Sequence, residues 1–511
     1  MSVPARTAGS RNLVLAAMIF AVAMTFIDQT IVSIAAPDIQ SELHLSGTGV
    51  QWAINAYLLS LAAFFAFGGR LADTVGHRRM VTLGVIVFAT ASGLCGLTPK
   101  GGAAEAWLIV FRVVQGFGAA IMFPAALAIV VQTFSLRERG KALALFFGIA
   151  GGLTAIGPVL GGFLTQWTWR AIFWVNIPVA IIALILIAVS KPVTDHRPAP
   201  IDYRGLVLIA AGVGLSVLGF QQSATWGWGD AKTIGCVVVG AALLVVFAFV
   251  ELRTAEPLMD VRIFRIRPFS VECSVLGISS LAFIPVFFFA SEYAQVALGK
   301  SASSASLVLL YFFLGFVVAA QIGGRMLDRS GAKRPVVLGC AIAAVGFWLW
   351  GRRVTGLDFS SQIWFVVLSG AGMGFMLGTS STDAVNRASR LSYGEATGIT
   401  QTVRNYAASL GIAILGSVLV SDFRSRLVDS LVSQGLPHAQ ASAEATRFSQ
   451  GGGGSTSAIP HFARLDFAFA TRSVLYGMAG IMAAAAVVGL LGLRRGVQQD
   501  EAAGSPVLTE T

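Results

Sequence analysis

Long apolar segments alternate along the chain with short polar connections. Each apolar segment has close to the ~20 residues that an α-helix needs to cross the hydrocarbon core of a bilayer. The pattern predicts fourteen membrane-spanning helices, which we place at residues 13–36, 51–71, 80–98, 106–131, 141–164, 171–190, 204–221, 233–251, 270–297, 305–327, 335–351, 361–382, 396–421 and 473–493. We therefore expect an all-α integral membrane protein.

Composition argues against a soluble protein. Hydrophobic residues make up 55% of the 511 positions and charged residues only 12%, whereas soluble proteins carry roughly 25% charged residues. The four cysteines, Cys95, Cys236, Cys273 and Cys340, fall within predicted spans, so we expect buried thiols rather than disulfides. The first apolar run exceeds the roughly 7–15 residues of a signal-peptide core, so we expect it to remain as the first span.

Basic residues collect in alternate connections between the spans. The chain has a net charge of +11, and most of its 36 Lys and Arg lie on one side, among them Arg78, Arg79, Arg137, Arg139 and Arg262. Because positively charged loops stay on the cytoplasmic side of a membrane, this asymmetry predicts that both termini are cytoplasmic. The positive charge is then a topology signal, and we expect no nucleic-acid partner.

The chain contains an internal repeat. The stretch "GRLADTVGHRRMVTLG" starts at Gly69 and "GRMLDRSGAKRPVVLG" starts at Gly324, with eight identities in sixteen positions. Each stretch follows the second span of a block of six, on the expected cytoplasmic side. Two such repeats predict two six-helix bundles with a substrate site between them near the middle of the membrane, which is a transporter architecture.

The expected segments follow from this repeat. We expect an N-terminal six-helix bundle at 1–190, a linker with two additional transmembrane helices at 191–269, a C-terminal six-helix bundle at 270–494 and a cytoplasmic tail at 495–511. The C-terminal bundle includes a long extracytoplasmic loop at 422–472, which contains "GGGGS". This loop could be a lid over the site, but we expect a flexible spacer, because Gly/Ser-rich segments behave as random coils.

An acidic residue, Asp28, interrupts the first span in "FAVAMTFIDQTIVSIAAPDI". Ionisable side chains inside a membrane are costly unless solvated or paired, so they mark functional sites. At ~1.5 Å per residue, Asp28 and Arg112 of the fourth span lie at similar depth and are able to form an ion pair. Their counterparts in the second repeat are Phe283 and Val366. This asymmetry favours a proton carrier, Asp28, with Arg112 as its partner; a purely structural ion pair is the alternative.

Four motifs together resemble those of one family. They are "IDQTIVSIAAPDI" in the first span, "GGRLADTVGHRR" after the second, "FRVVQGFGAA" in the fourth and "GGLTAIGPVLGG" in the fifth. The chain resembles, nearly end to end, the 14-spanner drug:proton antiporters of the major facilitator superfamily. The resemblance implies export of amphipathic drugs or toxic compounds across the cell membrane, in exchange for protons, by alternating access. Export of a lipid or an endogenous secondary metabolite is the alternative, and a membrane enzyme or sensor is less expected.

The resemblance also implies which residues serve conformational change. The loop after the second span acts in the family as a latch that forms and breaks, whereas its charge alone would make it a topology anchor. The Gly-Pro step in the fifth span is expected to be a hinge or seal, since proline removes a helix hydrogen bond. The residues concerned are Gly69, Asp73, Gly76, Arg78, Arg79, Gly157, Pro158, Gly161 and, in the second repeat, Asp328.

Polar residues within the spans are candidates to line a substrate cavity. Arg404 is expected to be structural or gating, although Asn405 departs from the glutamine that the family has there. Glu272 and Glu292 lie near opposite ends of the ninth span. Solvation at the membrane interface accounts for both and is what we expect for Glu272; for Glu292 the alternative is that it faces the outer vestibule. The cavity candidates are Asp28, Asn55, Tyr57, Gln115, Glu292 and Arg404.

The sequence predicts no catalytic or metal-binding constellation. "AQVALGKS" fits a relaxed phosphate-loop pattern, but it follows a membrane helix rather than a strand, so we reject it. The five histidines are scattered through loops without metal-ligand spacing. We therefore expect no enzyme activity, cofactor or metal, and a monomer whose partners are a small-molecule amphipathic substrate, protons and the lipid bilayer.

The charge asymmetry gives a testable topology. Reporter fusions at Thr98, Ser190, Ser455 and the C-terminus should report outside, inside, outside and inside, because the basic connections are retained in the cytoplasm. Paired fusions to a reporter active only outside and to one active only inside measure each position. An external C-terminus would contradict the scheme.

Overall fold

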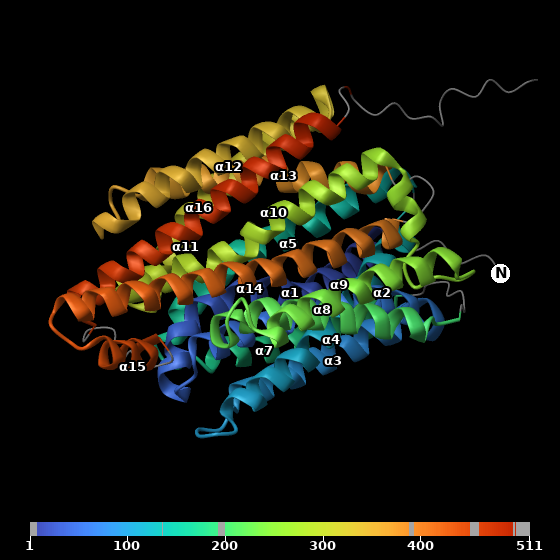
Figure 1. Ribbon diagram of the computed structural model, residues 1–511. Helices are drawn as coiled ribbons and strands as arrows, with labels where there is room; N and C mark the ends of the chain where they lie inside the picture. Colours follow the sequence, from blue (N-terminus) through green and yellow to red (C-terminus); the bar gives the residue numbers. More distant parts are fainter. Residues whose placement is uncertain are drawn as a thin grey trace, which may run out of the picture.

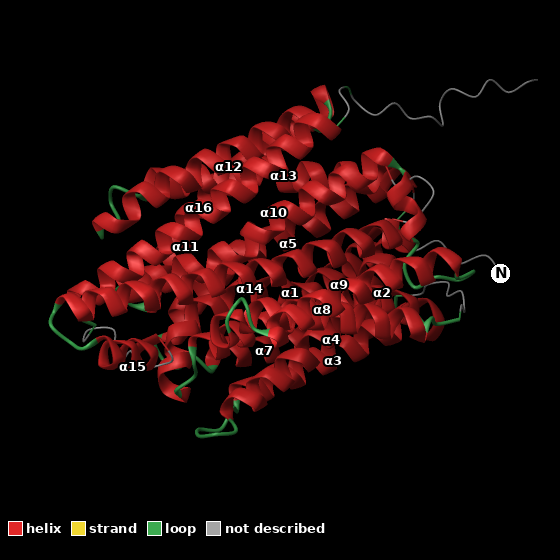
Figure 2. Ribbon diagram, viewed as in Figure 1, coloured by secondary structure: helices red, strands yellow, loops and turns green. Residues whose placement is uncertain are grey.

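The computed structural model describes residues 8–134, 136–192, 200–387, 393–449, 459–493 and Gly496. Nearly all of these residues are helical, and no strand occurs among them (Figure 2). The long helices lie side by side with their axes roughly aligned (Figure 1). The expectation of an all-α architecture is confirmed.

Within the described part, thirteen helices are long and apolar enough to cross a membrane. They follow the order of the predicted spans, and α5, 30 residues long, occupies the remaining predicted position. The first half comprises α1 (Ala8–Leu43), α2 (Gly47–Val75), α3 (His77–Gly96), α4 (Ala104–Thr133), α5 (Leu136–Thr165), α6 (Ala171–Trp174) and α7 (Asn176–Ser190). Two further helices follow, α8 (Tyr203–Trp226) and α9 (Ala231–Arg253), and then the 3₁₀ turn η1 (Val261–Arg265).

The second half repeats the arrangement of the first. α10 (Arg267–Glu292) continues directly into a π-helical turn, η2 (Tyr293–Ala297). The remaining elements are α11 (Ala302–Ser330), α12 (Lys333–Arg353) with the 3₁₀ turn η3 (Val354–Gly356), α13 (Ile363–Arg387), α14 (Tyr393–Ser433), α15 (His438–Ser449) and α16 (His461–Gly492).

The repeated motif forms the same turn in both halves. Gly76 follows α2 with φ 107°, and Gly331 follows α11 with φ 76°. Residues with a Cβ rarely adopt positive φ, so both repeats need glycine at this position. Each glycine N–H donates to the carbonyl four residues earlier, that of Ala72 in the first half and of Leu327 in the second. The sequence repeat is therefore also a structural repeat.

Glycines bring helices together at equivalent positions of the two halves. Gly84 on α3 faces Met122 on α4, and Gly339 on α12 faces Gly372 on α13. A Cβ at Gly84 would lie 2.6 Å from the Met122 Cβ, and one at Gly339 would lie 2.7 Å from the Gly372 carbonyl oxygen. Small residues allow such close packing of membrane helices.

The two additional helices form a hairpin, α8–α9, beside the seam between the halves. α8 contacts α2 of the first half and α14 of the second. The carboxamides of Asn55 on α2 and Gln221 on α8 lie 2.6 Å apart, and Asn55 also hydrogen-bonds Ser409 on α14. The hydroxyls of Ser223 on α8 and Ser417 on α14 are 2.6 Å apart. The hairpin therefore bridges the two halves, a role that its position in a predicted linker does not reveal.

The two halves also contact each other directly along the last quarter of α1. The Nε2 of Gln295, which follows α10, donates to the carbonyl of Ile34 on α1, at 2.9 Å. Near this end, Gly162 on α5 lies against Ser306 on α11. We call this the joined end of the bundle and the opposite end, where α1 begins, the terminal end.

The predicted loop at 422–472 is largely helical, so the expectation of a flexible spacer is wrong for its described residues. α14 continues to Ser433, α15 follows, and α16 begins at His461. The stretch 451–455 lies outside the described residues.

An amphipathic pattern explains this difference. Phe423 and Leu427 are one helical turn apart and both are buried. Phe423 packs on Phe467 of α16, with ring centroids 5.2 Å apart. The residues between Phe423 and Leu427 are polar, so the average hydropathy of this segment is low. The spacing of its apolar residues is nevertheless typical of a helix with one apolar face.

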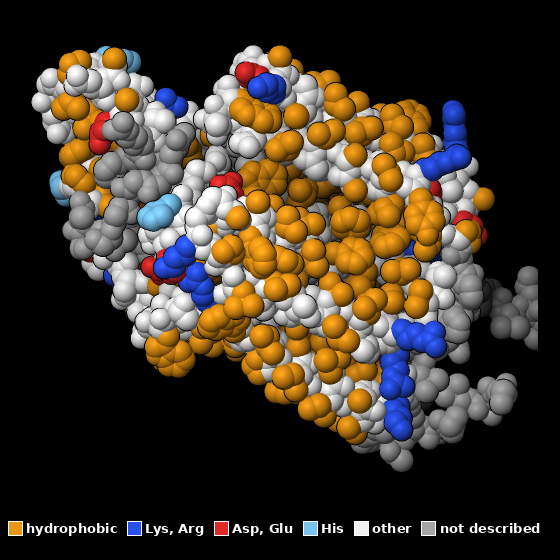
Figure 3. Space-filling model, turned by 90° about the horizontal axis from the view of Figure 1, so that it is seen from below, with side chains coloured by type: hydrophobic (Ala, Val, Ile, Leu, Met, Phe, Trp, Pro, Cys, Tyr) orange, Lys and Arg blue, Asp and Glu red, His pale blue; other side chains and the backbone are white. Residues whose placement is uncertain are grey.

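On the face that Figure 3 shows, hydrophobic side chains cover the middle and most charged side chains lie toward the two ends. Large exposed apolar residues include Ile185 on α7, Val207 on α8, Phe249 on α9 and Leu314 on α11. Such a belt suits contact with lipid, since a soluble monomer rarely exposes large apolar patches. All four cysteines are free thiols, as expected; three are buried, but Cys236 is only half-buried.

The contact between α3 and α4 can be tested with matched glycine substitutions. Gly84→Ala should destabilise the protein by about 1–3 kcal/mol, the usual cost of overpacking, because the new methyl group meets Met122 and backbone. Gly214→Ala on α8, where a Cβ would meet open space, is the control. Thermal unfolding of the purified proteins in detergent measures both, and equal midpoints would contradict the close contact.

Candidate functional site

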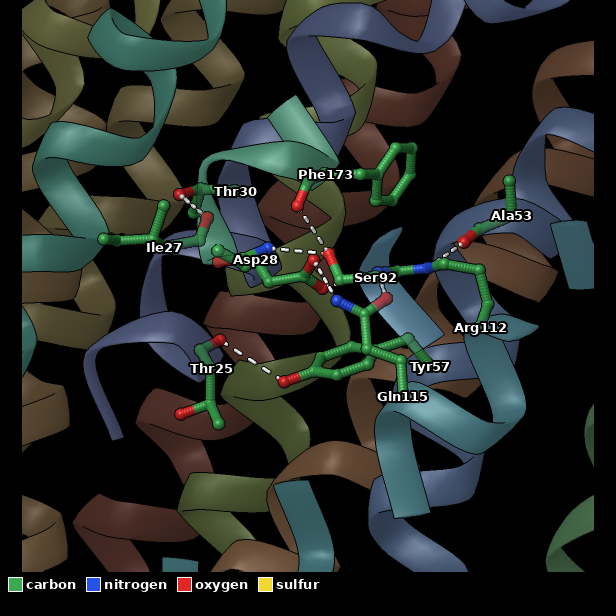
Figure 4. A network of polar contacts seen from close by, with 11 residues as sticks. Thr25, Ile27, Asp28, Thr30, Ala53, Tyr57, Ser92, Arg112, Gln115 and Phe173 are labelled. Atoms are coloured by element: carbon green, nitrogen blue, oxygen red, sulfur yellow. Dashed lines mark hydrogen bonds and ion pairs between the residues drawn. The ribbon is translucent and has the colours of Figure 1, made fainter. Parts of the chain in front are cut away.

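The predicted pair of charges is present and buried. Asp28 on α1 and Arg112 on α4 are each 1% exposed. Arg112 Nη1 donates to Asp28 Oδ2 at 2.6 Å (Figure 4). Burying either charge alone would be costly, so each requires the other.

Gln115 completes a closed network with this pair. Its Nε2 donates to Asp28 Oδ1 at 2.9 Å, and its Oε1 accepts from Arg112 Nη1 at 2.8 Å. Arg112 and Gln115 are three residues apart on α4, so they lie on one face of the helix. Both carboxylate oxygens of Asp28 therefore have a partner.

A third helix contributes a backbone group to the network. Arg112 Nε donates to the carbonyl of Ala53 on α2 at 2.7 Å. The close approach of α2 and α4 makes this possible: Gly116 faces the Tyr57 carbonyl, and the Ser60 hydroxyl donates to the Val113 carbonyl at 2.7 Å. The network thus joins α1, α2 and α4.

Aromatic rings enclose the charged groups. The Arg112 guanidinium lies 4.6 Å from the centroid of the Tyr57 ring and 5.9 Å from that of Phe173. The Tyr57 hydroxyl donates to the Thr25 carbonyl at 3.4 Å. Figure 4 shows Tyr57 and Phe173 on either side of the polar network. Rings that face a guanidinium stabilise its charge when water is excluded.

The antiporter-like motif of the fifth span packs against the helix that carries Asp28. Gly157 lies against Ile27 and Thr30 of α1, and Gly161 lies against Ile31. The Thr30 hydroxyl donates to the Thr154 carbonyl on α5 at 3.0 Å.

Pro158 is buried within the same α5 segment. Movement of α5 at this proline would therefore act directly on α1.

The other cavity candidates lie outside this network. Asn55 belongs to the seam with Gln221 and Ser409. Arg404 Nη1 donates to Gln401 Oε1 at 3.0 Å, and its Nε has no hydrogen-bond partner. Glu292 lies at the end of α10.

The loop motif lies at the terminal end. Asp73 Oδ1 and His77 Nε2 are 3.1 Å apart, both within the motif, and Arg70 forms a 2.7 Å ion pair with Glu256 after α9. Arg78 and Arg79 are exposed.

Asp328 in the second repeat is also exposed. The ion pair between Arg70 and Glu256 connects the loop motif to the base of the hairpin, which sequence reasoning missed.

Glu272 is not solvated at an interface, so that expectation is wrong. It is 0% exposed and accepts a hydrogen bond from Ser380 on α13. The contact of α10 with α13 causes this burial. The polar positions Ser380 and Asp383, one helical turn apart on a neighbouring span, were the available signal, since buried polar groups seek partners.

Comparison with known proteins now identifies the family. The family model of the Major Facilitator Superfamily matches residues 18–412. The chain belongs to the major facilitator superfamily. It is therefore a multi-pass membrane transporter, as its repeat predicted.

Several relatives in this superfamily bear names from drug resistance. The tetracenomycin C resistance and export protein of Streptomyces glaucescens is 34% identical over 430 residues, 83% of this chain and 78% of the relative. The puromycin resistance protein pur8 of Streptomyces alboniger is 31% identical over 80% of this chain and 81% of the relative. The multidrug transporter protein MdtP of Bacillus subtilis is 29% identical over 86% and 81%.

Solved structures of the superfamily share the fold. The xylose transporter XylE from E. coli, in a partially occluded inward-open conformation, has a TM-score of 0.61 at 11% identity, covering 96% of this chain and 99% of that chain. The POT family transporter PepTSo also has a TM-score of 0.61, at 15% identity, covering 95% and 99%. The expected major facilitator fold is confirmed.

The buried pair gives a test of the network that needs no substrate. Arg112→Ala should lower the free energy of unfolding by about 3–5 kcal/mol, because it leaves a buried carboxylate without its counter-charge. Adding Asp28→Asn should recover part of that loss, since the unpaired charge is removed. Unfolding of the four proteins of this double-mutant cycle in detergent measures the coupling, and strictly additive effects would contradict it.

Proposed function

We propose that the chain exports amphipathic small molecules, drugs or other toxic compounds, in exchange for protons. Asp28 is the proton carrier in this proposal and Arg112 is its partner. The observation that carries the proposal is the enclosed pair they form, because it is a titratable group inside a membrane transporter. The resistance and export names of the relatives support the substrate class.

The network offers a physical link between protonation and shape. A proton on Asp28 removes one charge of the pair and leaves the guanidinium with Gln115 and the Ala53 carbonyl. The free energy of this buried arrangement therefore depends on whether Asp28 carries a proton.

The same helices carry contacts between the halves. The carbonyl of Ile34 on α1 accepts a hydrogen bond from Gln295, and Asn55 on α2 donates one to the carbonyl of Ser409. A ligand shifts a conformational equilibrium only through a difference in its affinity for the two states. Protonation of Asp28 supplies such a difference next to these contacts.

One cycle of exchange then runs as follows. Substrate enters from the cytoplasm while Asp28 gives up its proton to that side. The halves change from inward-open to outward-open, the substrate leaves, and Asp28 takes a proton from outside. One substrate moves outward and at least one proton moves inward.

Several sequence expectations are part of this proposal. The chain acts as a monomer in the cell membrane with both termini in the cytoplasm. Tyr57 and Gln115 contact substrate beside Asp28, and Asn55 and Arg404 line the path. The loop around Asp73 is a conformational latch, and Pro158 is the hinge of α5.

A second substrate class remains a candidate. The relative from Streptomyces glaucescens is named for resistance to and export of tetracenomycin C, so an endogenous secondary metabolite is as natural a cargo as a foreign drug; a lipid is the third candidate. The neighbouring genes would discriminate, because a biosynthetic cluster, a drug-responsive repressor and lipid-handling genes point to different cargoes.

Asp28→Asn tests the coupling. The asparagine resembles a protonated carboxyl in shape but cannot release a proton, so proton-driven efflux should fall to background. The measurement is proton release from purified protein on addition of a compound that the wild type exports, with tetracenomycin C and puromycin as first probes.

Asp38→Asn, on the same helix and outside the network, is the matched control and should release protons like the wild type. If Asp28→Asn also releases as many protons as the wild type, Asp28 is not the carrier.

A further inference from the structure

A second carboxylate is buried in the half that lacks the ion pair. Glu292 ends α10 and is only 7% exposed. Its Oε1 has no hydrogen-bond partner, and no ion pair joins it to another residue in the described ranges. Asp28 is 1% exposed and has two partners. A buried ionised carboxylate without a counter-charge is costly, so this position requires a positive charge that the described residues do not supply.

The polar side chains on either side of Glu292 have hydrogen-bond partners, unlike Glu292 Oε1. Ser291 Oγ accepts from Gln295 Nε2 at 2.9 Å. The Tyr293 hydroxyl donates to the Val354 carbonyl at 2.7 Å. Buried polar groups normally have partners, and here Oε1 of Glu292 is left without one.

The backbone changes form directly after Glu292. Tyr293–Ala297 is a π-helical turn, in which Leu298 N–H donates to the Tyr293 carbonyl at 3.2 Å. Such turns are rare and occur frequently at functional sites. This turn brings Gln295 to the Ile34 carbonyl of the other half. Glu292 therefore lies three residues from a contact that must break if the halves separate at the joined end.

Three positively charged side chains at the joined end have other partners. Arg464 Nε on α16 donates to the Ala297 carbonyl at 2.7 Å. Arg170 pairs with Glu42 at 2.6 Å, and Lys100 lies 3.1 Å from the same carboxylate. None of these ion pairs or hydrogen bonds involves Glu292.

We propose that Glu292 is a second proton-binding site of this transporter, loaded when the halves separate at the joined end. Ala297, the last residue of the candidate span, is only five residues after Glu292, so a small opening suffices to admit water. The carboxylate then takes a proton, forms the neutral acid and is enclosed again without a counter-charge, and it releases that proton when the halves open at the terminal end. The inference rests on the proton exchange proposed above and adds one proton to each exchange.

Infrared difference spectra of the purified full-length protein, recorded across a pH step, test this without a substrate. Each protonated carboxyl gives a carbonyl band. Glu292→Gln should lose one such band and take up one proton fewer per protein than the wild type. Glu292→Asp keeps the carboxyl and should keep both the band and the proton.

Two further variants separate this inference from the proposed function. Asp28→Asn should lose a different band and leave the Glu292 band in place. Glu272→Gln, on the same helix but at a carboxylate that accepts a hydrogen bond from Ser380, is the matched control and should leave the Glu292 band in place.

These measurements test the role of Glu292 independently of whether Asp28 is a proton carrier. A Glu292→Gln protein with the bands and proton count of the wild type would overturn the second site and leave the role of Asp28 untouched. An unchanged proton count with selective loss of binding for a cationic probe would also overturn it, because Glu292 would then serve the charge of the substrate.

Discussion

The first half of this transporter is organised around one enclosed ion pair. Asp28 and Arg112 are both withdrawn from water, so neither charge is tolerable without the other. Gln115 and the Ala53 carbonyl use the remaining hydrogen-bonding capacity of the pair. The requirement that all these groups meet fixes the relative positions of α1, α2 and α4, beyond what packing of small residues alone would impose.

Most of the fold and the centre of the site could be predicted, because each has a local signal. Membrane spans are long apolar runs, and Asp28 and Arg112 stand out as charges at matching depth. Other features depend on contacts between distant segments. The burial of Glu272 requires Ser380, and the bridge through Gln221 requires Asn55 and α14. The sequence does not show which residue a hydroxyl or amide side chain within an apolar helix contacts, so these contacts are found only in the structure.

The two halves share a backbone but differ in chemistry at equivalent positions. The counterpart of Asp28 is Phe283, which stacks on Phe316 of α11 with centroids 5.6 Å apart. Phe287 stacks in the same way on Phe313, at 5.1 Å. Duplicated glycine turns and close helix contacts preserve the scaffold, while one copy holds a paired charge and the other an aromatic cluster. A structural repeat thus predicts architecture better than it predicts chemistry.

The α8–α9 hairpin is a third structural unit, in addition to the two halves that move relative to each other during transport. Because α8 hydrogen-bonds both α2 and α14, any opening along this seam must carry the hairpin with one half and break its bonds to the other. Such bonds between membrane helices are worth on average about 0.6 kcal/mol each. Substitutions along α8 can therefore adjust the rate at which the halves exchange in small steps, while the proton chemistry of Asp28 stays intact.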